Sequence, residues 1–202
     1  VIVLTLLCHG CPLQAIVAAV GLDERTVAAW RDRAGRHGQR FDEHHVLSGQ
    51  VELGHVQADE LFIKVVARRL WMAMAMAVPS RLWLGGVVRA RRDLELITTV
   101  VQMVRRAAKG LAFLVCVDGL ASYVTAFVRV FRNPVRAGKP GRPRLAAIPG
   151  LLLGQVIKHH SGRRFVGVTR RAVLGTAQAI AAVLTATGTG TGINTSYIER
   201  LN

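Results

Sequence analysis

Apolar residues near the start of the chain recur at helical spacing, and turn residues interrupt them. Two apolar segments, 2–7 and 12–20, are separated by a glycine and by a proline, which is favoured in the first turn of a helix. Gly21 stands where a sharp turn requires a positive φ, and Asp23 can cap a third helix over 24–33. The pattern therefore predicts three short helices.

The second and third of these helices have the spacing of a helix-turn-helix, a motif that places its last helix in the major groove of DNA. The third helix would expose side chains suited to DNA contact: Arg25, Thr26, Arg31 and Arg33. An ordinary helical hairpin has the same apolar spacing, so it is the basic outer face that favours DNA binding. We therefore predict a helix-turn-helix DNA-binding domain over residues 1–40.

A polar stretch follows, and beyond it the apolar period changes from helical to alternating. The stretch 35–50 is rich in His, Gly and charge, which predicts the end of the third helix and a linker at 41–53. From residue 54 the segments HVQADELFIKV, WMAMAMAV and RLWLGGVVRA alternate as strands do, with Pro79-Ser80 between the last two. They predict an antiparallel meander.

The rest of the chain adds helices and strands to this meander. Asp93 can cap an amphipathic helix that Lys109-Gly110 ends, and LAFLVCVD predicts a buried strand. The further predicted elements are a helix over 121–131, a flexible basic loop over 132–144, extended segments at 155–160 and 164–168, a helix over 176–187 and a last helix from 195. This order predicts an α+β domain over 54–202, a sheet covered by helices.

The charge balance implies a polyanionic partner. The 202 residues include 27 Lys and Arg against 12 Asp and Glu, a formal net charge of +15, and nucleic acid is the commonest partner of such a protein. A coding sequence rich in G and C would favour Arg over Lys, but it does not explain the scarcity of acids. In the loop 132–144 the expected DNA contacts are Arg136, Lys139, Arg142 and Arg144.

Membrane and zinc-binding classes fit the sequence poorly. The mean hydropathy is +0.33, yet one apolar window contains Pro79 and the other decays into a Thr-Gly repeat, so no transmembrane segment is predicted. Cys8 and Cys11 form a CxxC without a second pair, which argues against a zinc site. An odd number of thiols without a signal peptide predicts the cytoplasm.

Two isolated acids stand out in the basic second half of the chain. After Glu95 the only acidic residues are Asp118, which ends the strand VCVD, and Glu199, which falls in the first turn of the last predicted helix. Asp59 lies in the first predicted strand. If the two strands are neighbours, Asp59 and Asp118 approach each other, and carboxylates in a basic domain suit hard divalent cations.

Each of these acids also has a purely structural interpretation. Asp59 can pair with a neighbouring Arg, and an aspartate before Gly119 is common where a strand turns. Ser196 and Glu199 match a capping box, in which the glutamate reaches back to a backbone N–H. The joint placement of the three acids behind a helix-turn-helix favours the alternative, in which bound ions promote phosphodiester transfer.

The chain resembles a known family at these same positions. The stretches VQADELFIKV around Asp59, LVCVDGLASY around Asp118 and INTSYIERLN around Glu199 are similar to DDE transposases of bacterial insertion sequences, particularly the type of the first-numbered insertion sequence and its relatives. HHSGRRFVGVTRRAVLG is similar to the segment that precedes the glutamate helix. The resemblance covers about residues 54–202.

The resemblance implies a fold, a chemistry and partners. It implies a ribonuclease H-like domain in which Asp59, Asp118 and Glu199 bind two Mg²⁺ or Mn²⁺ ions and are catalytic. The reactions would be cleavage at transposon ends and joining to target DNA, in a homo-oligomeric complex on double-stranded DNA in the bacterial cytoplasm, at the nucleoid. Arg200, in the same motif as the glutamate, would contact DNA.

One departure from the family leaves alternatives open. Family members continue for several helical turns beyond the glutamate, whereas only three residues follow Glu199 here. The expectation is a C-terminally truncated catalytic domain whose third ligand is weakly held. A non-catalytic DNA-binding remnant or regulator derived from a transposase is the second hypothesis, and a structural RNA-binding protein is a weaker third.

Overall fold

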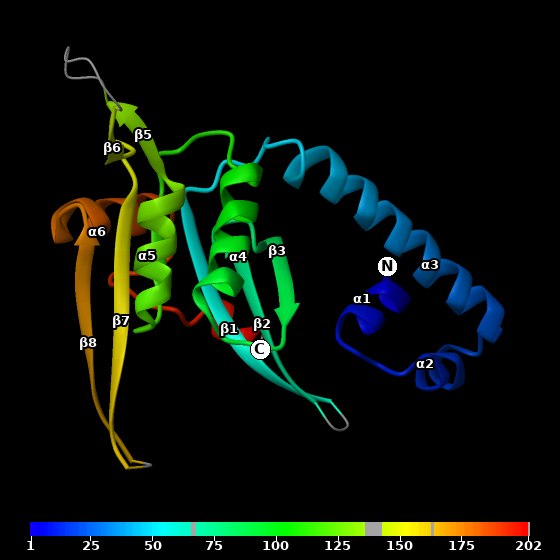
Figure 1. Ribbon diagram of the computed structural model, residues 1–202. Coiled ribbons are helices and arrows are strands. Elements are labelled where there is room, and N and C mark those ends of the chain that lie inside the picture. Colours follow the sequence, from blue (N-terminus) through cyan, green and yellow to red (C-terminus); the bar gives the residue numbers. More distant parts are fainter. Residues whose placement is uncertain (66–67, 136–142, 163, 202) are drawn as a thin grey trace. The chain divides into compact units, whose positions relative to one another are not determined.

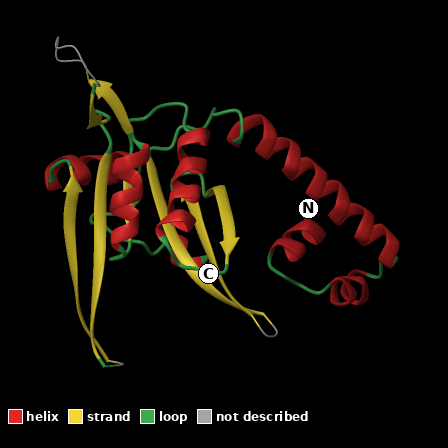
Figure 2. Cartoon of the chain, in the orientation of Figure 1, coloured by secondary structure: helices red, strands yellow, loops and turns green. Residues whose placement is uncertain are grey.

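The computed structural model describes residues 1–65, 68–135, 143–162 and 164–201. The chain divides into two compact units, Val1–Ser48 and Gly49–Asn202, which are described separately. The first is entirely helical, and the second is a sheet with helices on both faces (Figures 1 and 2).

The N-terminal unit contains three helices, α1 (Ile2–Cys8), α2 (Leu13–Val20) and α3 (Glu24–Phe41). One residue from each, Val3, Ile16 and Val27, is buried in a shared apolar core. Gly21 has a φ of 66°, as the predicted turn requires. Asp23 caps α3, since its side chain accepts a hydrogen bond from the backbone N–H of Arg25 at 2.9 Å.

The predicted end of the third helix at residue 33 is wrong. α3 continues to Phe41 and is followed by a π-helical turn, Asp42–Val46. Nothing lies within 4 Å of a Cβ placed on Gly35 or Gly38, so both glycines are on the open side of the helix. A glycine within a helix lowers its stability by only about 1 kcal/mol relative to alanine. That cost is too small to end a helix that is already capped and packed against its neighbours.

The C-terminal unit is built on a six-stranded mixed sheet. The strands, in chain order, are β1 (His55–Val65), β2 (Arg68–Ala77), β3 (Leu82–Arg89), β4 (Leu114–Val117), β7 (Leu152–Ser161) and β8 (Arg164–Leu174). In space the order is β3-β2-β1-β4-β7-β8. The central strands β1, β4 and β7 are parallel, and the outer pairings are antiparallel. This arrangement is compatible with a ribonuclease H-like fold.

Helices cover both faces of this sheet. α4 (Leu94–Ala107) and α5 (Ala121–Val130) pack side by side over the face turned to the viewer in Figure 1, and α6 (Ala177–Ala186) lies on the other face. α4 begins at its predicted cap, where Asp93 accepts the N–H of Leu96 at 3.0 Å. The buried residues of α4 are spaced for a single helix face: Leu96, Ile97, Val100, Val101, Val104 and Ala107.

The C-terminal segment crosses the same face as α6 and is tied to β1 through Gln57. The buried Gln57 amide donates to the Asn194 backbone oxygen at 2.8 Å, and its oxygen accepts the N–H groups of Tyr197 and Ile198, each at 3.0 Å. Gly154 of β7 allows close approach, because a Cβ there would lie 2.9 Å from the Ile193 side chain. The sheet thus fixes the segment that carries Glu199.

Two predictions for the second half of the chain need correction. The basic loop predicted over 132–144 includes strand β5 (Arg132–Val135) and the start of β6 (Arg144–Ala147), which pair antiparallel. Arg136, Lys139 and Arg142 lie outside the described residues. The predicted last helix is a single 3-10 turn, Ile198–Arg200.

His55, at the start of β1, predicts a pH dependence of stability. It is buried, its Nδ1 lies 2.8 Å from Thr189 Oγ1, and burial, reinforced by the charge of Arg81, lowers its pKa to about 4. His55 is therefore protonated below about pH 6.5 in the unfolded chain but only below about pH 4 in the native protein. The stability that is present above pH 6.5 is lost as the pH falls toward 4. Between pH 7 and pH 5 the wild type should lose about 2 kcal/mol of unfolding free energy through this histidine, and His55→Gln should keep it. Urea unfolding at the two pH values measures both changes. Equal losses in both proteins would contradict this.

Candidate metal centre

Three carboxylates converge where the short central strand ends. β4 pairs with β1 only as far as Val117, opposite Ala58. Asp59 and Glu60 follow on β1, and Asp118 follows on the chain leaving β4. One carboxylate oxygen from each of these three acids lies within 4.8 Å of the other two.

The end of β4 explains how neighbours on one strand reach a common point. Successive strand side chains point to opposite faces, so Asp59 lies on the face of Gln57 and the C-terminal segment, and Glu60 on the face of α4 and α5. Because no β4 residue fills the position beyond Val117, both side chains can approach Asp118 at the open edge of β1. Backbone donors orient two of them: Leu120 N–H to Asp118 Oδ1 and Glu60 N–H to Asp59 Oδ1, both at 2.9 Å.

Glu60 is the most deeply buried of the three acids. Its side chain is 1% exposed, and Arg92, in the loop before α4, donates to Glu60 Oε1 from Nε at 2.7 Å and also from Nη2. The same guanidinium Nη2 lies 3.7 Å from Asp118 Oδ2. Burial and the Asp118 charge raise the pKa of Glu60, while Arg92 and Tyr123 oppose that rise. Arg92 therefore links two of the three carboxylates.

Tyr123 of α5 brings a buried hydroxyl to this cluster. Its side chain is fully buried, and burial followed by the charge of Glu60 raises its pKa well above the usual value, with smaller effects of Asp59 and Asp118. A side-chain hydrogen bond between Glu60 and Tyr123 contributes to both shifts, because it lowers the pKa of Glu60 and raises that of Tyr123. Within the described residues, however, neither Tyr123 Oη nor Glu60 Oε2 has a partner of normal geometry. A buried carboxylate oxygen in this position, close to two other carboxylates, is an environment that a bound cation would satisfy.

Glu199 lies on the wall of the same pocket but is bound to other groups. A pocket of about 630 Å³ is lined by Asp59, Asp118 and Glu199, together with Arg92, Gly119, Leu120, Val156, Ile157, Lys158 and His160. Glu199 accepts hydrogen bonds from Lys158 Nζ at 2.7 Å and Thr195 Oγ1 at 2.6 Å. Burial alone would raise the pKa of Glu199, but these hydrogen bonds and the Lys158 charge outweigh it and lower the pKa.

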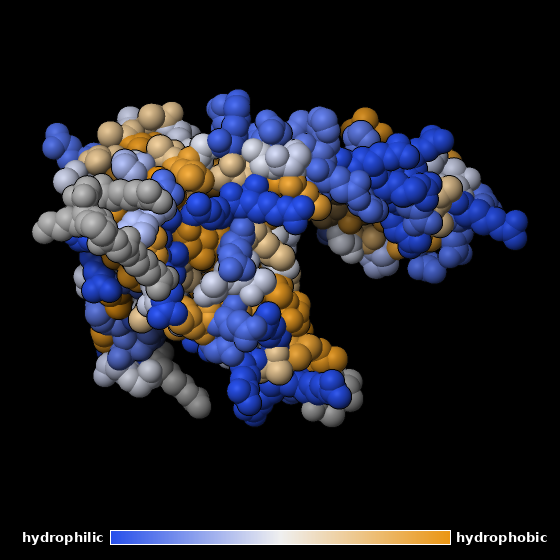
Figure 3. All heavy atoms as spheres, turned by 45° about the horizontal axis from the view of Figure 1, so that its top comes forward, coloured by the Kyte–Doolittle hydropathy of each residue, from blue (hydrophilic) through white to orange (hydrophobic). Residues whose placement is uncertain are grey.

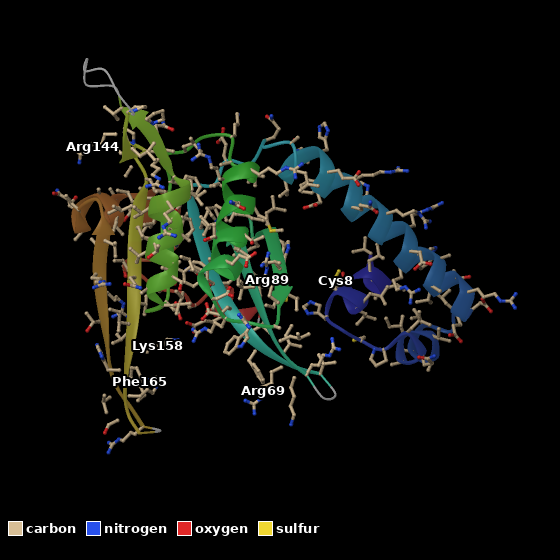
Figure 4. All side chains as sticks on the ribbon, viewed as in Figure 1. Cys8, Arg69, Arg89, Arg144, Lys158 and Phe165 are labelled. Atoms are coloured by element: carbon tan, nitrogen blue, oxygen red, sulfur yellow. The ribbon has the colours of Figure 1, made fainter. Side chains whose placement is uncertain are left out.

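The structure therefore places the three predicted ligands differently. Asp59 and Asp118 are brought together, and the third acid of their cluster is Glu60. Glu199 lines the same pocket and pairs with Lys158 (labelled in Figure 4). The capping box, which is the structural alternative for Glu199, does not form, because the Glu199 N–H donates to Thr195 O and the Ser196 hydroxyl donates to Asn194 Oδ1. The role of Glu199 as a ligand stays a prediction.

The sequence missed Glu60, Arg92, Tyr123 and Lys158 as members of this site. Strand alternation places Glu60 on the face opposite Asp59, and only the early end of β4 brings the two together. The available signal was the adjacency of two acids in a chain with few of them. Arg92 and Lys158 carry no signal, since they are two cations among 27 Lys and Arg.

The predicted DNA contacts within the described residues are mostly exposed. Arg25, Arg31 and Arg33 project from α3, which is largely hydrophilic on the face shown in Figure 3, while Thr26 is half-buried. Arg31 also pairs with Asp32 at 2.9 Å. Two further predicted DNA contacts are also exposed. They are Arg144 of β6 (labelled in Figure 4) and Arg200, whose guanidinium is 5.8 Å from the Tyr197 ring centre.

Comparisons with family models, with curated proteins and with solved structures give no match for this chain. None of the described helices combines the length and the apolar character needed to cross a lipid bilayer.

Proposed function

We propose that the C-terminal unit is a metal-dependent DNA strand-transfer domain, that of a DDE-type insertion-sequence transposase with a ribonuclease H-like fold. The observation that carries the proposal is the meeting of Asp59, Glu60 and Asp118 at the end of β4. Carboxylates at neighbouring strand ends, inside a domain of strong positive charge, provide oxygen ligands for cations where a polyanion binds.

The donor set fits hard cations such as Mg²⁺ or Mn²⁺. Asp59 and Asp118 would hold them, with Glu60 Oε2 as a further oxygen and with Glu199 in the lining of the same pocket. Two such ions supply activation of a water or a DNA 3′-hydroxyl and stabilisation of the leaving oxygen.

The protein's own residues orient the site and offer positive charge to a phosphate. Arg92 holds Glu60 and lies close to Asp118, which fixes the direction of two ligands before any ion arrives. Lys158 lies in the wall of the same pocket and forms an ion pair with Glu199. A DNA phosphate that draws Lys158 toward itself would leave the Glu199 carboxylate available to a cation, so substrate binding and completion of the ligand set are coupled.

The N-terminal unit would recognise double-stranded transposon ends. Its short α2–α3 turn and the exposed cations of α3 are the features that support a helix-turn-helix, with Arg25, Arg31 and Arg33 toward the DNA. Cleavage and joining at paired ends would take place in a homo-oligomer assembled on DNA.

The metal requirement tests the proposal directly. With a labelled duplex taken from the DNA that flanks the gene, and a supercoiled target, we expect cleaved and joined products with Mg²⁺ or Mn²⁺. We expect none with a chelator. We also expect none with Ca²⁺, because Ca²⁺ binds its oxygen ligands at longer distances and in more variable geometry than Mg²⁺ does. Products measured on a denaturing gel that form equally well in chelator would refute a metal-dependent reaction.

A second candidate is a DNA-binding protein that does not cleave. The pairing of Glu199 with Lys158 favours it, because that pair removes one carboxylate from the ligand set. This candidate predicts binding to duplex DNA without any product under all four of these conditions.

A further inference from the structure

The strands β7 and β8 form a hairpin that extends beyond the central strand. β4 pairs with β7 only as far as Val117, opposite Gln155, and beyond that point β7 pairs with β8 alone. We call residues 156–162 and 164–170 the β7–β8 arm. Figure 1 shows β7 and β8 extending together toward the bottom of the view, the direction in which β1 and β2 also extend. The carboxylate cluster thus lies at the base of the arm.

One face of this arm continues the wall of the metal pocket. Lys158 and His160 are two residues apart on β7 and line the pocket with Asp59 and Asp118. Phe165 of β8 pairs with His160, and their ring centres are 6.0 Å apart. Cross-strand partners share a face, so the aromatic ring of Phe165 extends this face toward the tip, as the labelled side chains in Figure 4 indicate.

This face combines an exposed aromatic ring with positive charge. Phe165 is 57% exposed. The sequence contains no acidic residue from 119 to 198, so every charge on the arm is positive. Exposed aromatic rings beside cations are the elements by which proteins hold single-stranded nucleic acid, with bases stacked on the rings and phosphates on the cations.

The pocket at the base of the arm is small. The chain that leaves β4 lies against β7, since a Cβ on Gly119 would be 3.6 Å from the Ile157 Cα and Gln155 Nε2 donates to Leu120 O at 3.5 Å. The pocket of about 630 Å³ beside it has the size of a small-molecule site, so it takes a nucleotide of one strand and not both strands of a duplex. The following nucleotides would lie along the arm.

We propose that the pocket-facing side of the β7–β8 arm binds an unpaired DNA strand, with Lys158 on a phosphate and Phe165 stacked on a base. The identity of the polymer as DNA rests on the proposed function. The arm holds the strand that leaves the carboxylates, so the substrate at the moment of reaction is a frayed or nicked end. Double-stranded DNA is bound elsewhere on the chain.

Fluorescence anisotropy with the full chain tests this assignment. The probes are a labelled oligothymidylate of about 15 nucleotides, within the range of single-strand sites, and a labelled hairpin duplex, both in chelator. We expect Phe165→Leu to weaken oligothymidylate binding roughly tenfold, because it keeps apolar volume but removes the ring. Phe165→Tyr, which keeps the ring, should bind like the wild type, and duplex affinity should be unchanged in both variants.

The salt dependence of oligothymidylate binding tests the proposed contact between Lys158 and a phosphate independently. We expect Lys158→Met to reduce the log–log salt slope for the oligothymidylate by about 0.7, the value for one single-strand phosphate. Arg129→Ala is the matched control, because Arg129 is an exposed cation of α5 outside the arm and the pocket, and its slope should equal that of the wild type.

Several outcomes would overturn the assignment. If Phe165→Leu binds the oligothymidylate as tightly as the wild type does, or loses as much affinity for the duplex as for the oligothymidylate, Phe165 does not stack on an unpaired base. If Lys158→Met and the wild type have equal salt slopes, Lys158 does not contact a phosphate. These results are separable from the proposed function, because the metal dependence of cleavage is measured in another assay and survives them.

Discussion

Asp118→Asn is expected to weaken Mn²⁺ binding more than a hundredfold and to abolish strand cleavage. Removal of a residue that only supports a metal ligand typically lowers metal affinity or activity roughly 10- to 100-fold, so the loss of a proposed ligand itself should lower it further. Asparagine is the informative substitution because its side-chain oxygen can still accept the Leu120 N–H that Asp118 Oδ1 accepts at 2.9 Å. The turn is then kept and only the charge is lost.

The stability of this variant without metal separates a ligand from a structural residue. Asp118 raises the pKa of Glu60, so the two carboxylates repel each other. Removing one charge relieves that repulsion, although it also removes the attraction of Asp118 for Arg92 at 3.7 Å. We expect the unfolding free energy in chelator to stay within about 1 kcal/mol of the wild type, while the stabilisation that the wild type gains from added Mn²⁺ disappears.

The control for this experiment is an acid-to-amide change away from the pocket. Glu52 pairs with Lys109 at 3.0 Å and its side chain is 80% exposed, so Glu52→Gln should bind Mn²⁺ and cleave DNA as the wild type does. Asp118→Asn that retains Mn²⁺ affinity, measured by titration calorimetry, would show that the cluster is a polar network around Arg92 and not a metal centre.

Much of the sheet could be predicted because its strands and helices are locally encoded. The alternation in HVQADELFIKV gives β1 nearly at its observed bounds, and Asp93 marks the start of α4. WMAMAMAV predicts β2 from Trp71 only, whereas the strand begins at Arg68, where the sequence predicts a turn. The long polar part of α3 could not be predicted in the same way. Its residues are individually compatible with a loop, and it is the capped, packed first half that carries the helix onward.

The site was only half predictable, for a reason of topology. The neighbouring positions of Asp59 and Asp118 follow once β1 and β4 are adjacent, which the order of elements suggests. Glu60 joins them because β4 ends at Val117, opposite Ala58, whereas the sequence predicts a strand that continues to Asp118. The partner of Glu199 depends on where β7 carries Lys158, and no local pattern encodes a contact between residues that are 41 positions apart.

The second large effect is expected at Gln57, which holds the C-terminal segment on the sheet. Gln57 Oε1 accepts two backbone N–H groups, those of Tyr197 and Ile198, and Nε2 donates to Asn194 at its backbone and side-chain oxygens. Gln57→Met keeps the length of the side chain but can make none of these bonds. Each buried group left unsatisfied costs about 1–3 kcal/mol, so we expect a loss of about 3 kcal/mol in unfolding free energy.

That loss has two forms, which hydrogen exchange distinguishes. If the segment stays in place, the whole protein is destabilised, and urea unfolding reports the full amount. If the segment detaches, the amides of Tyr197 and Ile198 exchange rapidly while those of β1 and β4 stay protected. Ser196→Ala is the control, because the Ser196 hydroxyl is exposed and makes its contact with Asn194 Oδ1, and its effect should lie within about 0.5 kcal/mol.

Gln57→Met also separates the two sides of the proposed ligand set. Asp59, Glu60 and Asp118 belong to β1 and to the end of β4, so Mn²⁺ should still bind when the C-terminal segment is loosened. Glu199 is carried by that segment, so cleavage should fall with its detachment even though the ion is held. A variant that loses its protection at Tyr197 and Ile198 but cleaves at the wild-type rate would exclude Glu199 from the reaction, and the catalytic set would then be the three carboxylates at the end of β4.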